Sequence, residues 1–145
     1  MFAKIVFVNL MLLFLVYNGK LIHAGEAMVS VMDVCKKQYP VANDEEVWLH
    51  FKKNGEIPDE SDKNAKCQFF CIPNKLGIVD DNGVLDEAKA KEIFMKFHPD
   101  FSNPDAVDQV IQECRKDNSG MDVCDSTYEY KKCMMKKYLS AKQSR

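Results

Sequence analysis

The sequence predicts an all-α domain of six short helices that is laced by disulfide bonds. Apolar residues recur at helical spacing along almost the whole chain, and no run alternates between apolar and polar residues as a half-buried strand does. Six cysteines follow an N-terminal apolar segment, an arrangement typical of secreted disulfide-linked proteins. At 145 residues, the chain is expected to hold one helical domain, over residues 25–145.

The N-terminal segment has the layout of a secretory signal peptide. Lys4 precedes an apolar run from Ile5 to Val16, and small residues follow at Ala24 and Ala27. We expect a signal over residues 1–24, with cleavage after Ala24 and with Ala27 as a second candidate. The apolar run is shorter than the about 20 residues that cross a bilayer. The protein is therefore expected to be secreted and extracellular, with no membrane span.

The charge balance excludes one class of partner. The chain has 20 Lys and Arg against 22 Asp and Glu, a formal charge of −2. Loss of Lys4 and Lys20 with the signal leaves 18 against 22, or −4. An acidic chain with scattered lysines has no electrostatic footprint for nucleic acid, so nucleic-acid binding is not expected.

Two helices are expected before residue 56. The first spans residues 28–39 and ends before Pro40. The second begins at Asn43, where the Asn-x-x-Glu pattern with Glu46 is typical of a capping box, and Gly55 stops it.

The third helix carries Cys67 and Cys71. These residues are one helical turn apart and share a face, so each can be bonded to a different neighbouring element. Pro73 is expected to kink or end this helix, because proline lacks the N–H donor and clashes with the preceding turn. Turn residues over 78–83 separate the third helix from the fourth.

Three further helices are expected after this turn. The fourth starts at Asp86, buries an apolar face and ends at His98-Pro99. Asn103 caps the fifth, with Pro104 at its first position. The last runs from about residue 126 to 139, and the polar end from 140 to 145 is expected to fray. The apolar face of the fourth helix comprises Ala90, Ile93, Phe94 and Phe97, and that of the fifth comprises Val107, Val110, Ile111 and Cys114.

The sequence indicates no metal or cofactor. The C-x-x-x-C pattern of Cys67 and Cys71 lacks the neighbouring histidines or second cysteine pair of a zinc site. Aligning Gly83 with the sixth position of a calcium-binding EF-hand loop places Ile78 and Lys89 where acidic ligands are required. We therefore expect no zinc, calcium or other cofactor.

Enzymatic activity is not expected either. Only His50 and His98 remain after signal removal, and no nucleophile or metal-binding motif accompanies them. Solvated or helix-capping roles explain both histidines without catalysis.

The apolar residues admit two interpretations. The chain has nine Phe, eight Met and five Tyr, which suit either a plain core or a deformable apolar cavity. The disulfides likewise fit a hollow interior that packing alone would hold less firmly, or a secreted protein that must resist unfolding and proteolysis.

The cysteine spacing resembles that of a known family. Intervals of 31, 3, 42, 9 and 8 residues separate Cys35, Cys67, Cys71, Cys114, Cys124 and Cys133. This string is similar to the six-cysteine signature of the insect odorant-binding proteins, in the pheromone and general odorant-binding group. Supporting marks are Gly55-x-x-Pro58, Asp81-x-Gly83 and Asp122-x-Cys124. The resemblance covers residues 28–138.

The resemblance implies six helices around an internal apolar cavity, with disulfides Cys35–Cys71, Cys67–Cys124 and Cys114–Cys133. It also implies a non-catalytic carrier that solubilises small hydrophobic odorants, pheromones or similar lipids and delivers them to olfactory receptors. We expect a monomer or a weak homodimer. Pro73 departs from the family pattern and is expected to reshape the cavity wall.

The cavity wall is expected to draw on the apolar stripes of the helices and on the connector after the second helix. Tyr130 is the best candidate to orient an oxygenated ligand, because a phenol offers one polar group in an apolar wall. A core tyrosine bonded to a backbone carbonyl is the alternative. The expected ligand-binding residues are Phe51, Ile57, Phe70, Leu76, Ile93, Phe94, Phe97, Val110, Ile111, Tyr130 and Met134.

Two other functions are weighed against this one. The first is an extracellular, disulfide-linked helical protein that packs solidly and binds a protein partner through its surface. The second is a secreted hydrolase, for which no nucleophile and base are found.

A further hypothesis concerns ligand release in mild acid, through carboxylates that hold the C-terminal segment at Lys136 or Lys137. Protonation of His98 at a helix C-terminus is expected to be favoured by the helix dipole.

Overall fold

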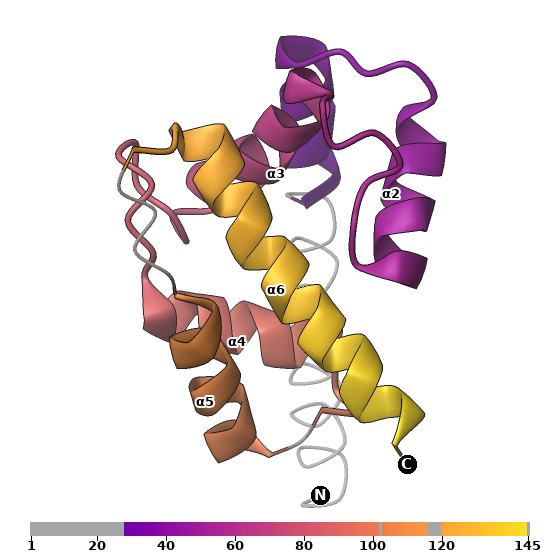
Figure 1. Ribbon diagram of the computed structural model, residues 1–145. Coiled ribbons are helices and arrows are strands. Elements are labelled where there is room, and N and C mark those ends of the chain that lie inside the picture. The colour runs from indigo at the N-terminus through magenta and orange to yellow at the C-terminus, as the bar shows by residue number, and fades with distance from the viewer. Residues whose placement is uncertain (1–27, 102, 116–119, 145) are drawn as a thin grey trace, which may run out of the picture. The chain divides into compact units, whose positions relative to one another are not determined.

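The computed structural model describes residues 28–101, 103–115 and 120–144 (Figure 1). The predicted signal peptide over 1–24 lies outside these residues. The chain divides into two compact units, Met1–Val34 and Cys35–Arg145. Every contact discussed below lies within the second unit, which holds all six cysteines.

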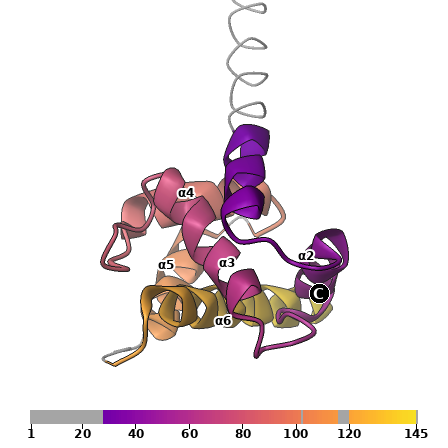
Figure 2. The same cartoon turned by 90° about the horizontal axis from the view of Figure 1, so that it is seen from above.

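The described residues form an all-α fold, as predicted. Residues 28–38 are helical. The only β-type pairing among the described residues is an isolated bridge between Val79 and Leu85. Helix α6 contacts α2, α3 and α5 (Figure 2). In the view of Figure 1, α2 lies on one side of α6, and α4 and α5 lie on the other. The remaining helices are α2 (Asp44–Asn54), α3 (Lys63–Lys75), α4 (Glu87–Phe97), α5 (Pro104–Cys114) and α6 (Val123–Gln143).

Most helix ends follow from local sequence, with one exception. The side chains of Asp86 and Asn103 accept hydrogen bonds from the first-turn N–H groups of α4 and α5, as expected of cap residues. Asn43 precedes α2 as predicted, but its side chain makes no capping bond. The reason is its backbone, which is left-handed, with φ of 54°, instead of extended as in a capping box.

Gly55 ends α2 as predicted, and the structure shows two reasons for a glycine there. Its φ is 75°, a left-handed conformation that glycine adopts without steric cost. A Cβ at this position would also lie 2.8 Å from Cγ of Lys136 on α6. The residue therefore permits the close approach of α2 and α6.

Pro73 does not end α3 where it stands. The helix continues to Lys75, two residues beyond the proline. Pro73 cannot donate to the carbonyl of Phe69, so one helical bond is lost in the last turn only. Its own carbonyl accepts hydrogen bonds from the N–H groups of Ile78 at 2.8 Å and Val79 at 3.3 Å, which direct the chain into the following turn.

Helix α6 is longer than predicted at both ends. Asp122 caps it, accepting from the N–H groups of Cys124 and Asp125, so it starts three residues earlier than expected. It continues to Gln143 instead of fraying from residue 140. Ion pairs with other elements support its C-terminal half: Lys136 with Glu56 and Lys137 with Glu113, both at 2.6 Å.

The burial expected for α4 is wrong. None of its residues is fully buried, and Phe97 is 55% exposed. Helix α4 packs mainly on α5, where Lys91 pairs with Asp108 and Glu87 pairs with Arg115, and its Phe94 ring also contacts Tyr138 of α6. These neighbours cover the apolar face incompletely, so Ala90, Ile93 and Phe94 remain half-buried.

The three disulfides have the pairing that the family resemblance implies. Cys35–Cys71, Cys67–Cys124 and Cys114–Cys133 have Cα–Cα distances of 5.7, 4.5 and 5.6 Å. Cys67 and Cys71 join α3 to different elements, as their spacing predicts.

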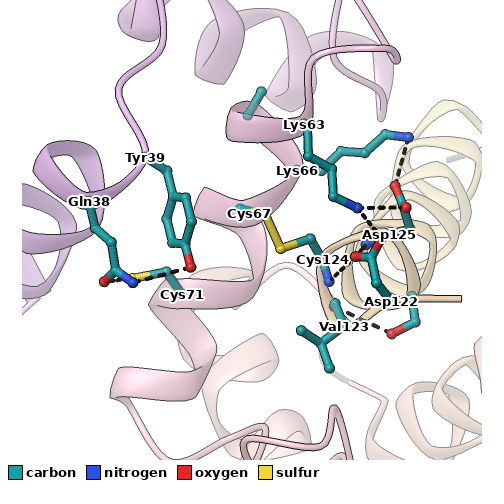
Figure 3. Close-up of a disulfide and its surroundings, with 12 residues drawn as sticks. Gln38, Tyr39, Lys63, Lys66, Cys67, Cys71, Asp122, Val123, Cys124 and Asp125 are labelled. Carbon is teal, nitrogen blue, oxygen red and sulfur yellow. Dashed lines mark hydrogen bonds and ion pairs between the residues drawn. A yellow bond between two sulfur atoms is a disulfide. The ribbon is translucent and has the colours of Figure 1, made fainter.

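Charged side chains lie on one side of the Cys67–Cys124 bond (Figure 3). Asp125 lies 2.8 Å from Lys63 and 3.0 Å from Lys66, and Asp122 also pairs with Lys63. Hydrogen bonds from the two lysines hold the pKa of Asp125 far below its usual range. The start of α6 is thus fixed to α3 by a covalent bond and by charge.

Across the described ranges, none of the helices combines the length and the apolar character that crossing a bilayer requires.

Candidate ligand site

The interior holds two apolar clusters, and α6 contributes to both. The first cluster lies among α2, α3 and α6 and consists of Val47, Phe51, Ile57, Ala65, Phe69 and Tyr128. The second cluster lies among α4, α5 and α6 and consists of Phe101, Val107, Ile111, Cys114 and Met134, with half-buried residues such as Phe94 and Tyr130 packed against it.

The residues predicted to line one wall fall into both clusters. Phe51 and Ile57 belong to the first cluster. Five belong to the second cluster or pack against it: Phe94, Val110, Ile111, Tyr130 and Met134. Phe70, Leu76 and Ile93 are half-buried outside both clusters, and Phe97 is mostly exposed. The second cluster therefore gathers the largest part of the predicted site.

The first cluster is packed and its polar groups are satisfied. The Trp48 and Phe69 rings stack with centroids 4.3 Å apart, and Phe51 lies 4.5 Å from Phe69. The fully buried Tyr128 hydroxyl accepts a hydrogen bond from the Ile57 N–H at 3.1 Å and donates one to Glu60 at 2.6 Å. These contacts are those of a structural core.

Tyr130 differs from Tyr128 in having no partner for its hydroxyl. Its oxygen is buried, and no hydrogen bond to it exists among the residues that the structure describes. Burial raises the pKa of Tyr130, so the hydroxyl stays protonated. The predicted alternative, a core tyrosine bonded to a backbone carbonyl, is not what these residues show. A buried hydroxyl without a partner is costly unless another molecule satisfies it.

The second cluster ends in a group of aromatic rings. His98 lies 4.7 Å from Phe94 and 4.2 Å from Tyr138 between ring centroids, and Phe101 contacts both of these neighbours. The Tyr138 hydroxyl donates to Asp100 at 3.0 Å. This group joins the end of α4 to the C-terminal half of α6.

Burial lowers the pKa of His98 below its usual 6.5; nearby Lys142 adds to the shift and Asp100 opposes it. Desolvation therefore disfavours the protonated form of His98, opposite in direction to the effect expected of the helix dipole. His50 lies elsewhere, with Nδ1 2.8 Å from the carbonyl oxygen of Glu56. Among the described residues, His50 bonds to a backbone carbonyl and His98 contacts aromatic rings, and neither contacts a serine, threonine or cysteine nucleophile.

We predict that His98 makes the protein less stable in mild acid. Because its pKa is lower in the folded state, the unfolded chain binds the proton more tightly, and stability falls as the pH drops through about 6.5. His98→Gln should reduce the difference in unfolding free energy between pH 7.5 and 5.5. An NMR titration should place the His98 pKa below 6.5, and a value above 6.5 would contradict the prediction.

The C-terminal ion pairs do not behave as hypothesised for ligand release. Glu56 and Glu113 do hold Lys136 and Lys137, but these pairs lower the pKa of each carboxyl from its usual 4.5. A lowered carboxyl pKa gives stability that is present above pH 4.5 and is lost only in stronger acid. Both pairs therefore persist in mild acid.

In the acidic turn after α3, the Asp80 carboxylate is bonded to backbone N–H groups of the same turn. Asp80 Oδ1 accepts from the N–H groups of Asn82 at 2.9 Å and Val84 at 2.8 Å. An open recess of about 490 Å³ borders this turn, with Asn74 and Leu85 among its lining residues. Over the described ranges, no three His, Cys, Asp or Glu side chains converge as metal ligands.

The sequence interpretation missed two polar residues on the inner face of α6. Thr127 is 5% exposed, and its hydroxyl has no partner among the described residues. Lys131, one turn later, is half-buried and has a lowered pKa of about 8 because its ammonium is desolvated. Helical spacing alone places Thr127, Lys131 and Met134 on one face, and this was the signal available.

The fold and its interior define a class: a disulfide-linked, all-helical domain with its apolar side chains gathered around one long helix. A family model described as the PBP/GOBP family matches residues 22–137, so the chain belongs to this family. It is 33% identical over 72 residues to general odorant-binding protein 19d of Drosophila melanogaster. That match covers 48% of this chain and 47% of the relative, so the chain spans about half the relative's length. No solved structure matches the chain.

Proposed function

We propose that the protein is a secreted, non-catalytic carrier that binds small hydrophobic ligands in an internal apolar cavity. It solubilises odorants, pheromones or similar lipids and delivers them to olfactory receptors, acting as a monomer or a weak homodimer. Membership of an odorant-binding family supports the carrier role. The ligand is proposed to lie against the second cluster.

The observation that carries this proposal is the buried, unpartnered hydroxyl of Tyr130. Tyr130 packs against the second cluster, as do the half-buried apolar residues Phe94, Met95 and Val110. A ligand oxygen that accepts its hydrogen bond would satisfy the hydroxyl while the rest of the ligand contacts apolar carbon. An apolar wall with one polar group is what a carrier of oxygenated volatiles needs.

Displacement of a fluorescent apolar probe by a panel of volatiles and lipids tests the carrier role. We expect several compounds to displace the probe in the micromolar range. Uniform failure would overturn the proposal and favour the alternative, a packed extracellular protein that binds a protein partner through its surface.

We predict opposite effects of Tyr130→Phe on ligand binding and on the empty protein. An oxygenated ligand should bind about fivefold more weakly, a loss of ~1 kcal/mol, while a hydrocarbon of the same size is unaffected. The ligand-free variant should be at least as stable as the wild type, because the hydroxyl that it loses has no partner. The measurements are probe displacement and urea unfolding.

Tyr128→Phe is the matched control. It removes a hydroxyl that is bonded to Ile57 and Glu60, so it should lower stability without separating oxygenated ligands from hydrocarbons. Equal weakening of both ligand types by Tyr130→Phe would contradict the role of Tyr130.

A further inference from the structure

The Lys131 side chain projects from α6 between the two apolar clusters. Tyr128, three residues before it, and Met135, four residues after it, belong to the first cluster or pack against it. Met134, three residues after it, belongs to the second cluster. Since residues three and four apart are neighbours on a helix surface, the Lys131 side chain projects along the boundary of the two clusters.

The Lys131 ammonium has no counter-charge in the described part of the chain. Three of the other four lysines of α6 pair with glutamates in the described residues: Lys132 with Glu60, Lys136 with Glu56 and Lys137 with Glu113. The Lys131 ammonium instead lies 5.5 Å from the centroid of the Phe69 ring. A cation–π contact compensates only part of the cost of desolvating an ammonium group.

The residues around Lys131 desolvate its ammonium group, although the side chain keeps some accessible surface. Desolvation alone lowers its pKa to about 8, yet the side chain keeps accessible surface. The ammonium is therefore held against the apolar interior, at the Phe69 ring, while part of the side chain stays open to a ligand.

A second donor lies on the same face. The Thr127 hydroxyl is one helical turn before Lys131, buried and without a hydrogen-bond partner among the described residues. An ammonium and a hydroxyl both donate, and together they match a group with two acceptor oxygens and one negative charge.

We propose that Lys131, together with the Thr127 hydroxyl, binds the carboxylate of an amphiphilic ligand such as a fatty acid, whose hydrocarbon tail lies against the second cluster. This inference rests on the proposed carrier function, because it places the head group of the carried ligand. A carboxylate would pair its negative charge with the Lys131 ammonium and would accept a hydrogen bond from the Thr127 hydroxyl.

Three ligands that differ only in the head group test the proposal. Dodecanoic acid, 1-dodecanol and methyl dodecanoate are compared by displacement of the fluorescent apolar probe, for the wild type and for Lys131→Met. The wild type should bind the acid at least about tenfold more tightly than the methyl ester, because the acid adds a charge-assisted hydrogen bond. Lys131→Met should abolish this preference and leave binding of the ester unchanged.

Two further variants control for charge and for folding. Lys53→Met removes an exposed lysine from α2 and should keep the preference for the acid. Lys131→Arg keeps the positive charge and should retain most of the preference. If Lys131→Met does not fold, the wild type, Lys131→Arg and the proton measurement below decide the question.

Proton uptake gives a second readout that a purely structural lysine would not produce. At pH 8 about half of the Lys131 side chains are neutral, so binding of dodecanoate should take up as much as about half a proton. At this pH His98 is neutral and Tyr130 is protonated, since the pKa of His98 is lowered and that of Tyr130 is raised. Titration calorimetry in two buffers of different ionisation enthalpy measures the uptake, which dodecanol should not cause.

The results separate this inference from the carrier function. If the alcohol and the ester bind but the acid has no advantage, or keeps it in Lys131→Met, the carboxylate site is overturned and the carrier function stands. If none of the three ligands binds and the wider panel also fails, both are overturned.

Discussion

Replacing Cys35 and Cys71 together with serine should lower the free energy of unfolding by about 2 to 5 kcal/mol. The bond closes a sequence separation of 36 residues, so its loss returns a large conformational freedom to the unfolded chain. It also ties the chain just before Pro40 to α3. Urea unfolding followed by the fluorescence of Trp48, the single tryptophan, measures the change.

The Cys114–Cys133 pair provides the comparison. Its separation is 19 residues, so the same double substitution there should cost less, by about 0.6 kcal/mol if loop entropy dominates. Peptide mapping of each variant should recover the other two disulfides unchanged. A Cys67–Cys71 linkage in the wild type would contradict the pairing described above.

Phe69→Ala should lower the free energy of unfolding by about 3 to 5 kcal/mol. Phe69 is 1% exposed and is in ring contact with Trp48, Phe51 and Tyr128, so its removal leaves a cavity that several rigid neighbours cannot fill. Unfolding followed by circular dichroism avoids the direct effect on Trp48 fluorescence.

Phe97→Ala is the matched control for this change. It removes the same side chain from a position that is 55% exposed, and it should alter the unfolding free energy by less than about 0.5 kcal/mol. Equal effects at the two positions would contradict the packed first cluster. A small loss at Phe69 alone would mean that the site collapses around the smaller residue.

The sequence alone determined the features that depend on residues a few positions apart. Asp86 and Asn103 cap helices because their side chains reach N–H groups two or three residues along the chain. Gly55 ends α2 because the left-handed conformation there favours glycine. The cysteine intervals carried the family's disulfide pairing, and the apolar spacing predicted an all-helical chain.

Only the tertiary structure decided what distant elements do to each residue. The apolar stripe of α4 predicted burial, but the neighbouring elements cover it incompletely and leave Phe97 exposed. Ion pairs with Glu56 and Glu113 accompany α6 as it continues past residue 139. Tyr128 and Tyr130 are the same residue type two positions apart in the sequence. Distant elements supply hydrogen-bond partners for the Tyr128 hydroxyl, and the described residues supply none for the Tyr130 hydroxyl. Lys131 is one of several lysines along α6. Its desolvation depends on the elements that surround it, and sequence spacing does not specify those contacts.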